Sequence, residues 1–372
     1  MRLALVHDYL NQYGGAERVL EVLHDLYPQS PIYTSIYDPS SMPDSYRTWD
    51  IRTSFMQRIP FALRLGLRFQ QSLLLLYPAA FESFDFSDYD VVLSVSSAWA
   101  KGVKTRPGTL NICYCLAPMR FAWNYQSYAD REQLPGPIRK ALPAAMAYLR
   151  RWDYANSQKV NRLIGISSTV VKRIGDCYQR SADLIFPPVE TEAISLGSGP
   201  GDGYLVLSRL VPYKRIDLAV AACSRLGLPL TVIGDGRERA PLEAIAGPTV
   251  RFLGRVSDAE AREALGRCRA FLFPGEEDFG ITPVEAMAAG RPVVAYASGG
   301  ALDTVREGET GQLFHPQTVD ALAAQLAVFD PGQFDSSKLR AHAERFSREH
   351  FQEAIAAYVD TAWQAHQGQV TV

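Results

Sequence analysis

Residues 204–234, YLVLSRLVPYKRIDLAVAACSRLGLPLTVIG, contain a β-rich run, a helical pattern and a second β-rich run. The runs cover Tyr204–Ser208 and Leu230–Gly234, and the helical pattern covers Lys214–Leu226. This order is typical of two parallel strands joined by a crossover helix. The stretch therefore predicts an α/β fold built on a parallel sheet.

The same alternation extends in both directions along the chain of 372 residues. Strands are predicted at Leu3–His7, Ile32–Tyr37, Val91–Ser96, Leu110–Cys115, Arg162–Ser167, Tyr204–Ser208, Leu230–Gly234, Val250–Leu253, Ala270–Pro274 and Pro292–Ala295. Helices are predicted over 16–26, Lys214–Leu226, Arg237–Ala246, Asp258–Cys268, Pro283–Ala289, Val319–Phe329 and about Arg348–Gln367. Such a chain forms doubly wound sheets with helices on both faces, and its length suits about two domains.

A Pro/Gly/Ser-rich stretch marks the predicted boundary between the domains. It runs from Pro187-Pro188-Val189 to the segment 195–203, SLGSGPGDG. The predicted domains are residues 1–187 and 203–347, each Rossmann-like. Because doubly wound sheets bind ligands at the carboxyl ends of their strands, two facing domains form a ligand cleft between them.

Composition excludes several classes of protein. Hydrophobic residues make up 47% and charged residues 21%, which argues against disorder. The net charge of −2 divides unevenly: residues 1–186 hold 21 basic and 16 acidic side chains (+5), and the rest hold 17 and 24 (−7). No basic stripe flanked by aromatic residues indicates a nucleic-acid partner.

The cysteines and the N-terminus favour a cytoplasmic protein. The five cysteines form no CxxC pair, which excludes a zinc site or a disulfide framework of the usual spacing. Cys113 and Cys115 lie two apart in a β-rich run and are predicted as a buried pair on one face. The apolar run at Leu3–Val6 is too short for a signal peptide, and no stretch reaches the ~20 apolar residues that span a bilayer.

Three segments at the ends of predicted strands contain the candidate binding and catalytic residues. Gly14-Gly15 stands before a helix, where it forms either an anion-binding loop or only a tight turn. Arg209 and Lys214 follow a strand and favour a bound anion such as a diphosphate over a solvated basic face.

The third segment is residues 276–285, EEDFGITPVE, directly after a strand. Thr282 is predicted as the N-cap of a helix that starts at Pro283, which places Glu285 in the first turn. Glu277 and Glu285 then face one volume, where they bind ribose and sugar hydroxyls. The alternative, an acidic loop that only caps the helix, does not explain Phe279-Gly280.

These motifs together resemble glycosyltransferase family 4. Glu277 and Glu285 have the Glu-x7-Glu spacing of retaining GT-B enzymes, and the likeness to the bacterial O-antigen and exopolysaccharide mannosyltransferase branch runs nearly end to end. The matching stretches are HDYLNQYGGAERVLE (7–21), CYCLAPMRFAWN (113–124), FPPVE (186–190), SRLVPYKRIDLAV (208–220), VIGDGRE (232–238) and EEDFGITPVEAMAAGRPVVAY (276–296). The resemblance implies the GT-B fold, with the last helix (about 348–367) packed on the first domain.

The resemblance also implies a role for each matching residue. Arg209 and Lys214 neutralise the donor diphosphate and the leaving group, and Glu277 holds the donor sugar. The remaining donor contacts come from Gly14, Gly15, Arg255, Val256, Phe279, Gly280, Ile281, Thr282 and Glu285, with Glu285 on the ribose and 254–256 on the base. We place His7, Asp8 and Arg120 on the acceptor side; an ordinary strand-end histidine is the alternative for His7. No metal and no cofactor is expected, because Arg and Lys supply the positive charge.

One position departs from the family pattern. Leu116 stands where this branch usually has a histidine that contacts the donor sugar near its 6-hydroxyl. Leucine forms no hydrogen bond, so an unpaired hydroxyl there costs about 1–3 kcal/mol. Three explanations stay open: the sugar is held differently, the donor lacks that hydroxyl, or activity is lost.

Residues 51–81 form a basic, apolar segment without an acidic residue up to Phe81. Arg52, Arg58, Arg64 and Arg68 alternate with apolar side chains, which suits an anionic membrane surface. The alternative is a core-facing helix with arginines along its flank; much of Leu73–Leu76 is expected in the core.

The expected activity is retaining transfer of a sugar from a nucleotide diphosphate donor, GDP-mannose or a related GDP-sugar. The expected acceptor is a polyprenyl-diphosphate-linked or growing glycan in surface polysaccharide biosynthesis, reached from the cytoplasm or from the inner face of the plasma membrane. The alternatives are a UDP-hexose-dependent transferase of the same fold and a nucleotide-sugar-binding protein without transfer activity.

Overall fold

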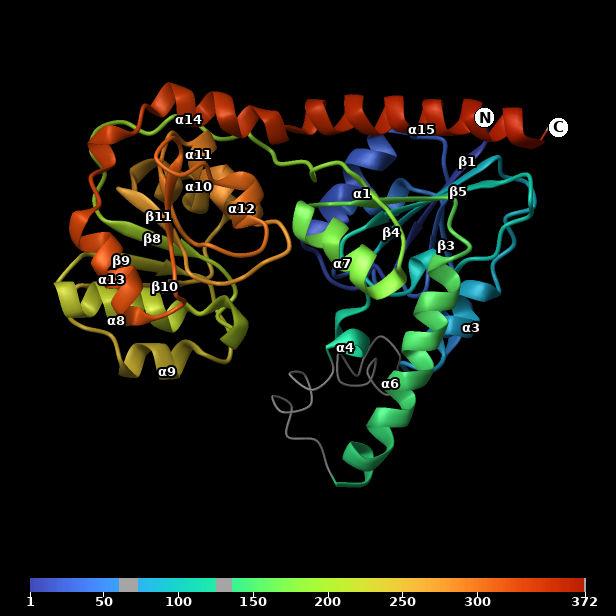
Figure 1. Ribbon diagram of the computed structural model, residues 1–372, viewed down its shortest axis with the longest axis horizontal. Coiled ribbons are helices and arrows are strands. Elements are labelled where there is room, and N and C mark those ends of the chain that lie inside the picture. Colours follow the sequence, from blue (N-terminus) through green and yellow to red (C-terminus); the bar gives the residue numbers. More distant parts are fainter. Residues whose placement is uncertain (60–72, 125–135, 371–372) are drawn as a thin grey trace. The chain divides into compact units, whose positions relative to one another are not determined.

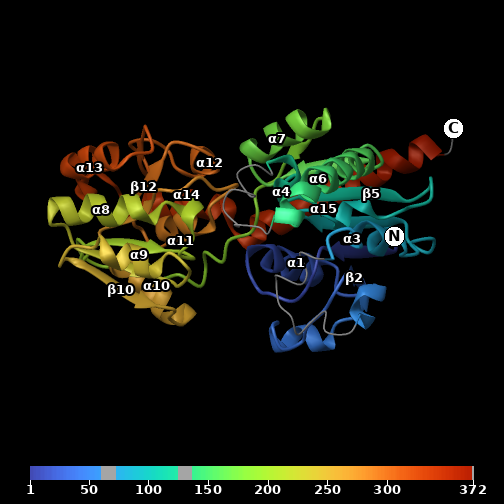
Figure 2. The same ribbon diagram turned by 90° about the horizontal axis from the view of Figure 1, so that it is seen from below.

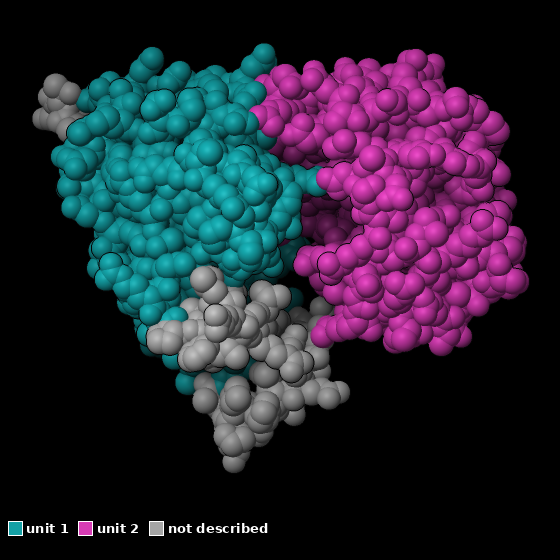
Figure 3. Space-filling view, turned by 180° about the vertical axis from the view of Figure 1, so that it is seen from behind, with its two compact units in different colours: residues 1–186, 352–372 teal, residues 187–351 magenta. Residues whose placement is uncertain are grey.

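The computed structural model describes residues 1–59, 73–124 and 136–370 (Figure 1). The chain divides into two compact units, which Figure 3 colours separately. Unit 1 comprises Met1–Phe186 and Gln352–Val372, and unit 2 comprises Pro187–Phe351. The chain therefore passes between the units twice, once after Phe186 and once within its last helix.

The Gly/Ser-rich run 195–203, which the sequence predicts as linker, is part of unit 2. The guanidinium of Arg291 donates hydrogen bonds to the carbonyls of Ser198, Gly199 and Gly266 at 2.8–3.0 Å. The unit boundary lies after Phe186 rather than at Gly203, and the buried Arg291 ties Ser198 and Gly199 of this run to the rest of unit 2.

In the described part of unit 1, seven strands form a parallel sheet in the order β3-β2-β1-β4-β5-β6-β7. Their bounds are β1 Leu3–His7, β2 Ile32–Thr34, β3 Ile51–Thr53, β4 Val91–Ser96, β5 Leu110–Cys115, β6 Arg162–Gly165 and β7 Asp183–Leu184. Strands β1, β4 and β5 are buried along their whole length, as expected for a sheet covered on both faces. The chain reverses its winding direction at the neighbours β1 and β4, so their carboxyl ends form a topological switch point.

Helices cover both faces of this sheet (Figure 1). They are α1 Gly15–Leu26, α3 Tyr77–Glu82, α4 Arg120–Trp123, α6 Gly136–Ser157, α7 Ser168–Tyr178 and α15 Arg348–Val370, with short 3-10 helices η1 Asp44–Thr48, η2 Phe55–Arg58 and η3 Ala100–Gly102. Side chains of α3 and α6 pack with Ala4, Val6 and Val92 in one core. His7 alternates with Val6 and bonds to α1 on the opposite face.

The leucine run before α3 is only half buried. Leu73 and Leu74 pack against the core, whereas Leu75 is 53% exposed and Leu76 is 38% exposed. The expectation that most of the run is core is therefore correct for its first two residues only. Arg64 and Arg68 of the basic segment lie outside the described residues.

In unit 2, six parallel strands among the described residues take the order β10-β9-β8-β11-β12-β13. They are β8 Tyr204–Leu207, β9 Leu230–Ile233, β10 Val250–Gly254, β11 Ala270–Phe273, β12 Val293–Tyr296 and β13 Gly311–Phe314. The helices are α8 Ile216–Leu226, α9 Arg239–Ala244, α10 Asp258–Arg267, α11 Ile281–Ala288, α12 Ala301–Thr304, α13 Val319–Val328 and α14 Ser336–Ala343, with 3-10 helices η4 Pro212–Lys214, η5 Pro331–Gln333 and η6 Glu344–Phe346. The connections from β8 to β9 and from β11 to β12 run in opposite directions along the sheet, so right-handed crossovers place α8 and α11 on opposite faces. Helix α8 packs on α13, and helix α11 packs on α14 (Figure 2).

All ten predicted strands are present, several of them shorter at the carboxyl end than predicted. The predicted helices are also present, and the prediction misses β3, β7, β13 and several helices, the longest of which is α6. Cys113 and Cys115 are buried, as predicted. Among the described residues, no helix combines the length and apolar character that a membrane crossing requires.

Candidate functional site

The switch point of unit 2 brings two of the predicted catalytic side chains into contact. Strands β8 and β11 are neighbours, and the chain after β8 carries Lys214 while the chain after β11 carries Glu277. The Lys214 ammonium and the Glu277 carboxylate form an ion pair, with side-chain exposures of 13% and 21%. A charged pair that is mostly but not wholly buried at the ligand end of a sheet remains within reach of a bound molecule.

Arg209 reaches the same corner through Tyr213. The Arg209 guanidinium donates to the Tyr213 hydroxyl at 3.2 Å, and the Lys214 ammonium lies 5.4 Å from the centre of the Tyr213 ring. Lys214 ends the 3-10 helix η4, so it does not open the next helix as the sequence predicts; α8 starts at Ile216. Two cations and one carboxylate therefore gather beside one aromatic ring.

Glycines allow the backbone segments of this corner to approach closely. A Cβ atom at Gly275 would lie 2.7 Å from the carbonyl oxygen of Lys214. Gly299 has φ +64°, its Cβ would overlap the carbonyl oxygen of Glu277, and the amide of Gly300 donates to that same oxygen at 2.8 Å. These three glycines hold Lys214 and Glu277 in place. The sequence prediction missed them because loop glycines are common, although each follows a predicted strand.

The helix after Glu277 begins earlier than predicted. Helix α11 starts at Ile281 with Gly280 as N-cap at φ +90°, and no side chain caps it. The prediction of Thr282 as N-cap is wrong, because the left-handed backbone of Gly280 already turns the chain into the helix. Glu285 consequently lies beyond the first turn and is half-buried.

The surroundings of Phe279 agree with a role for its backbone rather than its ring. The Phe279 ring is 3% exposed and packs against Phe346 with ring centres 5.7 Å apart. The uncapped amide groups at Gly280, Ile281 and Thr282 are the polar groups that this helix start offers to an anion.

The predicted base-contacting residues lie elsewhere in unit 2. Arg255 and Val256 follow β10, which is two strands from β8, or about 10 Å. Arg255 is exposed, and Val256 lines a groove of about 660 Å³ together with residues from the amino ends of β8, β9 and β10. Neither Lys214 nor Glu277 lines that groove.

In unit 1 the Gly14-Gly15 loop opens α1, with Gly14 as an N-cap without a side-chain bond. His7, at the end of β1, pairs with Glu17 of α1 through Nε2 and Oε1 at 3.1 Å, and both side chains are at most 3% exposed. The Nδ1 atom of His7 is buried without a partner. The structure therefore puts His7 under the glycine loop as a buried pair with Glu17.

Asp8 is fully engaged by the protein itself. Its carboxylate accepts hydrogen bonds from the backbone amides of residues 97–100 at 2.6–2.9 Å and from the Ser97 hydroxyl at 2.7 Å. A carboxylate with five donors has no free acceptor for a sugar hydroxyl. Asp8 thus organises the loop after β4, and its place on the acceptor side stays a prediction.

Leu116 and Arg120 lie after β5, the strand next to β4. Leu116 is half-buried, and its amide donates to the carbonyl of Ser96 at 2.9 Å. Arg120 is exposed and begins α4.

Within residues 1–59, 73–124 and 136–370, no three His, Cys, Asp or Glu side chains are placed to hold a metal ion.

Comparison with known proteins matches most of unit 2 to one protein family. Residues 200–346 match the sequence profile of the family "Glycosyl transferases group 1". The match covers less than half of the chain, so it shows what residues 200–346 are similar to. The Lys214–Glu277 corner lies within the matched residues.

One curated relative is similar to part of the chain. The GDP-mannose-dependent alpha-mannosyltransferase of Mycolicibacterium smegmatis is 37% identical over 108 residues, or 29% of this chain and 28% of the relative. The chain matches no more than about half the length of the first curated relatives, between 28% and 48%.

Solved structures are similar to the chain over both units. The sucrose-phosphate synthase of Thermosynechococcus elongatus has a TM-score of 0.72 at 18% identity, covering 98% of this chain and 100% of that one. HepE of Anabaena, in complex with UDP-glucose, has a TM-score of 0.68 at 16% identity, covering 97% and 100%. The chain thus has the GT-B fold of two Rossmann-like domains.

Proposed function

We propose that this chain transfers a sugar from a nucleotide diphosphate donor with retention of configuration. The observation that carries this proposal is the Lys214–Glu277 ion pair beside Arg209 at the switch point of unit 2, within the residues that match a glycosyltransferase family. Arginine and lysine neutralise a diphosphate and the negative charge that grows on it as the sugar leaves. Glu277, held by Lys214, accepts hydrogen bonds from hydroxyls of the donor sugar.

The same charge arrangement favours a reaction without a metal ion. In a front-face transfer, the departing phosphate takes the proton of the acceptor hydroxyl, while Arg209 and Lys214 stabilise the phosphate. The bond between the anomeric carbon and the phosphate oxygen breaks, and a bond from the acceptor oxygen to the same face of that carbon forms. The protein supplies orientation and positive charge, and no protein nucleophile is required.

For the donor we propose GDP-mannose or a related GDP-sugar. The 37% identity to a GDP-mannose-dependent enzyme over 108 residues supports this choice. A UDP-hexose is the second candidate, favoured by the likeness of the whole chain to a protein solved with UDP-glucose. A protein that binds the donor without transfer is the remaining alternative, because Leu116 offers no hydrogen bond to the sugar.

For the acceptor we propose a polyprenyl-diphosphate-linked or growing glycan. The basic segment 51–81 supports this proposal, since an acceptor anchored in a membrane requires the enzyme to approach an anionic surface. Phe55 is 44% exposed and Arg58 is exposed, whereas Arg52 is engaged by Asp50. The contact is proposed for the apolar and basic side chains beyond Arg52.

The test is thermal unfolding in EDTA with GDP, UDP or ADP and then with their sugar conjugates. A ligand at 100 times its Kd stabilises the folded protein by about 2.7 kcal/mol. We expect GDP and GDP-mannose to raise Tm in the wild type and not in Lys214→Ala. Arg225→Ala, which removes an exposed ion pair with Asp320 in the same unit, is the matched control and keeps the shift.

Two outcomes would redirect the proposal. If no nucleotide raises Tm, the binding roles of Arg209 and Lys214 are wrong. If the donor binds but no free nucleotide forms slowly in the absence of an acceptor and no product forms in its presence, the chain is a binding protein rather than a transferase.

A further inference from the structure

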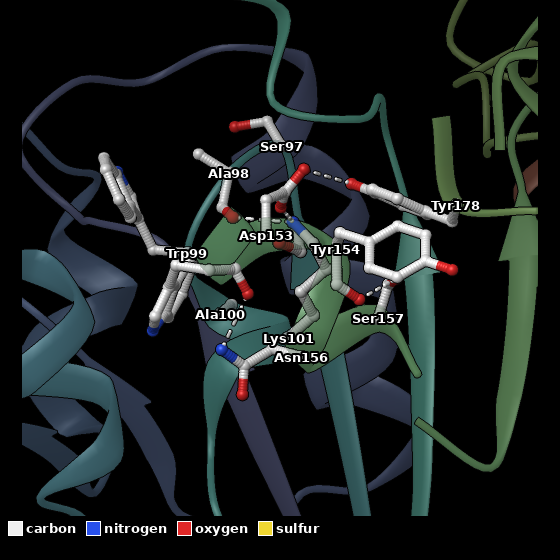
Figure 4. Close-up of polar contacts among 12 residues, drawn as sticks. Ser97, Ala98, Trp99, Ala100, Lys101, Asp153, Tyr154, Asn156, Ser157 and Tyr178 are labelled. Carbon is white, nitrogen blue, oxygen red and sulfur yellow. Dashed lines mark hydrogen bonds and ion pairs between the residues drawn. The ribbon is translucent and has the colours of Figure 1, made fainter. Parts of the chain in front are cut away.

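The core of unit 1 contains an ion pair between two completely buried side chains. The Lys101 ammonium lies 2.5 Å from Oδ1 of Asp153, and neither side chain has any exposed area (Figure 4). Lys101 belongs to η3, directly after β4, and Asp153 lies on α6. Neither residue belongs to unit 2.

Asp153 joins four separate elements of unit 1. Besides Lys101 of η3, its Oδ2 atom accepts from Nε1 of Trp123 at 2.7 Å and from the hydroxyl of Tyr178 at 2.9 Å. Trp123 ends α4, and Tyr178 ends α7 (Figure 4 shows the Tyr178 contact). The carboxylate thus fixes α4 and α7 relative to the loop after β4.

The loop after β4 is fixed from two directions. The Lys101 ammonium donates to the carbonyl of Ala98 at 2.6 Å, so it closes the loop on itself. The carboxylate of Asp8 binds the amides of the same loop from the end of β1. Residues 97–101 are therefore held by two buried carboxylates, Asp8 after β1 and Asp153 on α6.

The stability of the fold does not by itself account for a completely buried ion pair. Burial by itself lowers the pKa of Lys101, but the Asp153 carboxylate together with the neighbouring Cys115 and Cys113 raises the pKa above its ordinary value, so the ammonium stays charged. Moving two charges out of water is costly, and apolar side chains of similar volume often give equal or greater stability. What apolar side chains do not reproduce is the direction of hydrogen bonds to Ala98, Trp123 and Tyr178.

We propose that Lys101 and Asp153 are positioning residues that hold the loop 97–100 and helix α4 in the geometry needed for sugar transfer. These two segments follow β4 and β5 at the ligand end of the unit 1 sheet, and the chain that enters α4 carries Leu116. The pair acts through these segments and does not touch the substrate. This inference rests on the proposed transferase function.

The test compares single and paired substitutions in the full chain. Lys101→Met alone leaves Asp153 charged and unpaired in the core, so Tm falls strongly. Lys101→Met with Asp153→Leu removes both charges, and we expect Tm to return close to the wild-type value. We expect kcat to stay about 10- to 100-fold below wild type, because a displacement near 1 Å is enough for such a loss.

Two further variants separate positioning from packing. Lys101→Met with Asp153→Asn keeps an acceptor for Trp123, so kcat should recover part of the loss. Trp123→Phe removes the indole N–H and part of the ring system; we expect this variant to stay folded and its kcat to fall several-fold. The exposed pair Lys172–Asp176, replaced as Lys172→Met with Asp176→Leu, is the matched control and should change neither kcat nor the nucleotide-induced Tm shift.

Hydrogen exchange supplies a readout that does not need activity. We expect faster exchange of the amides at 97–100 and 120–124 in the apolar double variant, with most of the GDP-induced Tm shift kept, since Arg209 and Lys214, which carry the proposed diphosphate binding, lie in unit 2. Wild-type kcat in both the double variant and Trp123→Phe would overturn the inference. A wild type that transfers no sugar, with altered exchange in the variants, would instead refute the proposed function.

Discussion

At the scale of single residues, Leu116 is the position that most directly bears on the identity of the donor sugar. It is half-buried after β5, and its side chain has no hydrogen-bonding atom. If the pocket selects a 6-deoxy sugar, Leu116→His should raise kcat/KM for a hexose donor and lower it for the 6-deoxy analogue, about 10-fold each way for a bond of about 1–3 kcal/mol. Parallel assays with both donors measure the preference, and an unchanged ratio would eliminate selection at this position.

Gly275 is a second residue whose substitution has a defined consequence. An alanine Cβ would lie 2.7 Å from the Lys214 carbonyl and would push η4 away from the loop that carries Glu277. We expect Gly275→Ala to destabilise the protein by about 1–3 kcal/mol and to weaken GDP binding. Gly175→Ala, in helix α7 with no atom near its Cβ, is the control and should stabilise by up to about 1 kcal/mol. Urea unfolding and titration calorimetry would show the two effects; wild-type affinity in Gly275→Ala would contradict the described corner.

At the scale of elements, the last turn of α1 carries a histidine that makes stability depend on pH. His24 stacks on Trp49 with ring centres 4.1 Å apart, and burial lowers the pKa of His24 more than Asp25 raises it. A pKa below the unfolded value of about 6.5 means that its contribution to stability is complete above that pH and is lost as pH falls through the folded value.

His24→Phe keeps the stacked ring and removes this titration. We expect its Tm to fall less than that of the wild type between pH 7 and pH 5, with part of the slope retained, because burial also lowers the pKa of His342. The exposed His350→Gln variant should follow the wild-type slope. Equal slopes for the wild type and His24→Phe would show that His24 does not contribute.

The positions of helices and strands along the sequence were more predictable than which of these elements lie beside one another in the fold. Apolar β-rich runs such as Leu3–His7 and Val91–Ser96 coincide with β1 and β4, because buried parallel strands are continuous apolar segments. Short strands such as β7 and the helix start at Gly280 depend on local backbone geometry that composition does not encode.

The contact of Lys214 with Glu277 depends on β8 pairing with β11, and strand order is set by tertiary packing rather than by any local pattern. The Lys101–Asp153 pair was missed for the same reason, since its members are 52 positions apart in the sequence and nothing near either one signals burial.

At the scale of the whole molecule, the charge divides along the chain, with +5 on residues 1–186 and −7 on the remainder. An anionic membrane attracts the first part by about 1 kcal/mol per basic residue near its surface, and salt screens this attraction. We expect the wild type to sediment with vesicles of anionic lipid at low salt and to be released as salt increases. Replacing Arg58, Arg64 and Arg68 with Glu should abolish sedimentation while the GDP-induced Tm shift is retained.

The matched control replaces Arg225, Arg267 and Arg306, exposed arginines of unit 2, with Glu and should sediment like the wild type. Sedimentation of the Arg58/Arg64/Arg68 variant would refute a membrane role for the segment, and the bulk charge of residues 1–186 would then be the remaining source of attraction. Loss in both triple variants would instead show that net charge alone, and not the segment that precedes α3, governs the encounter with the membrane.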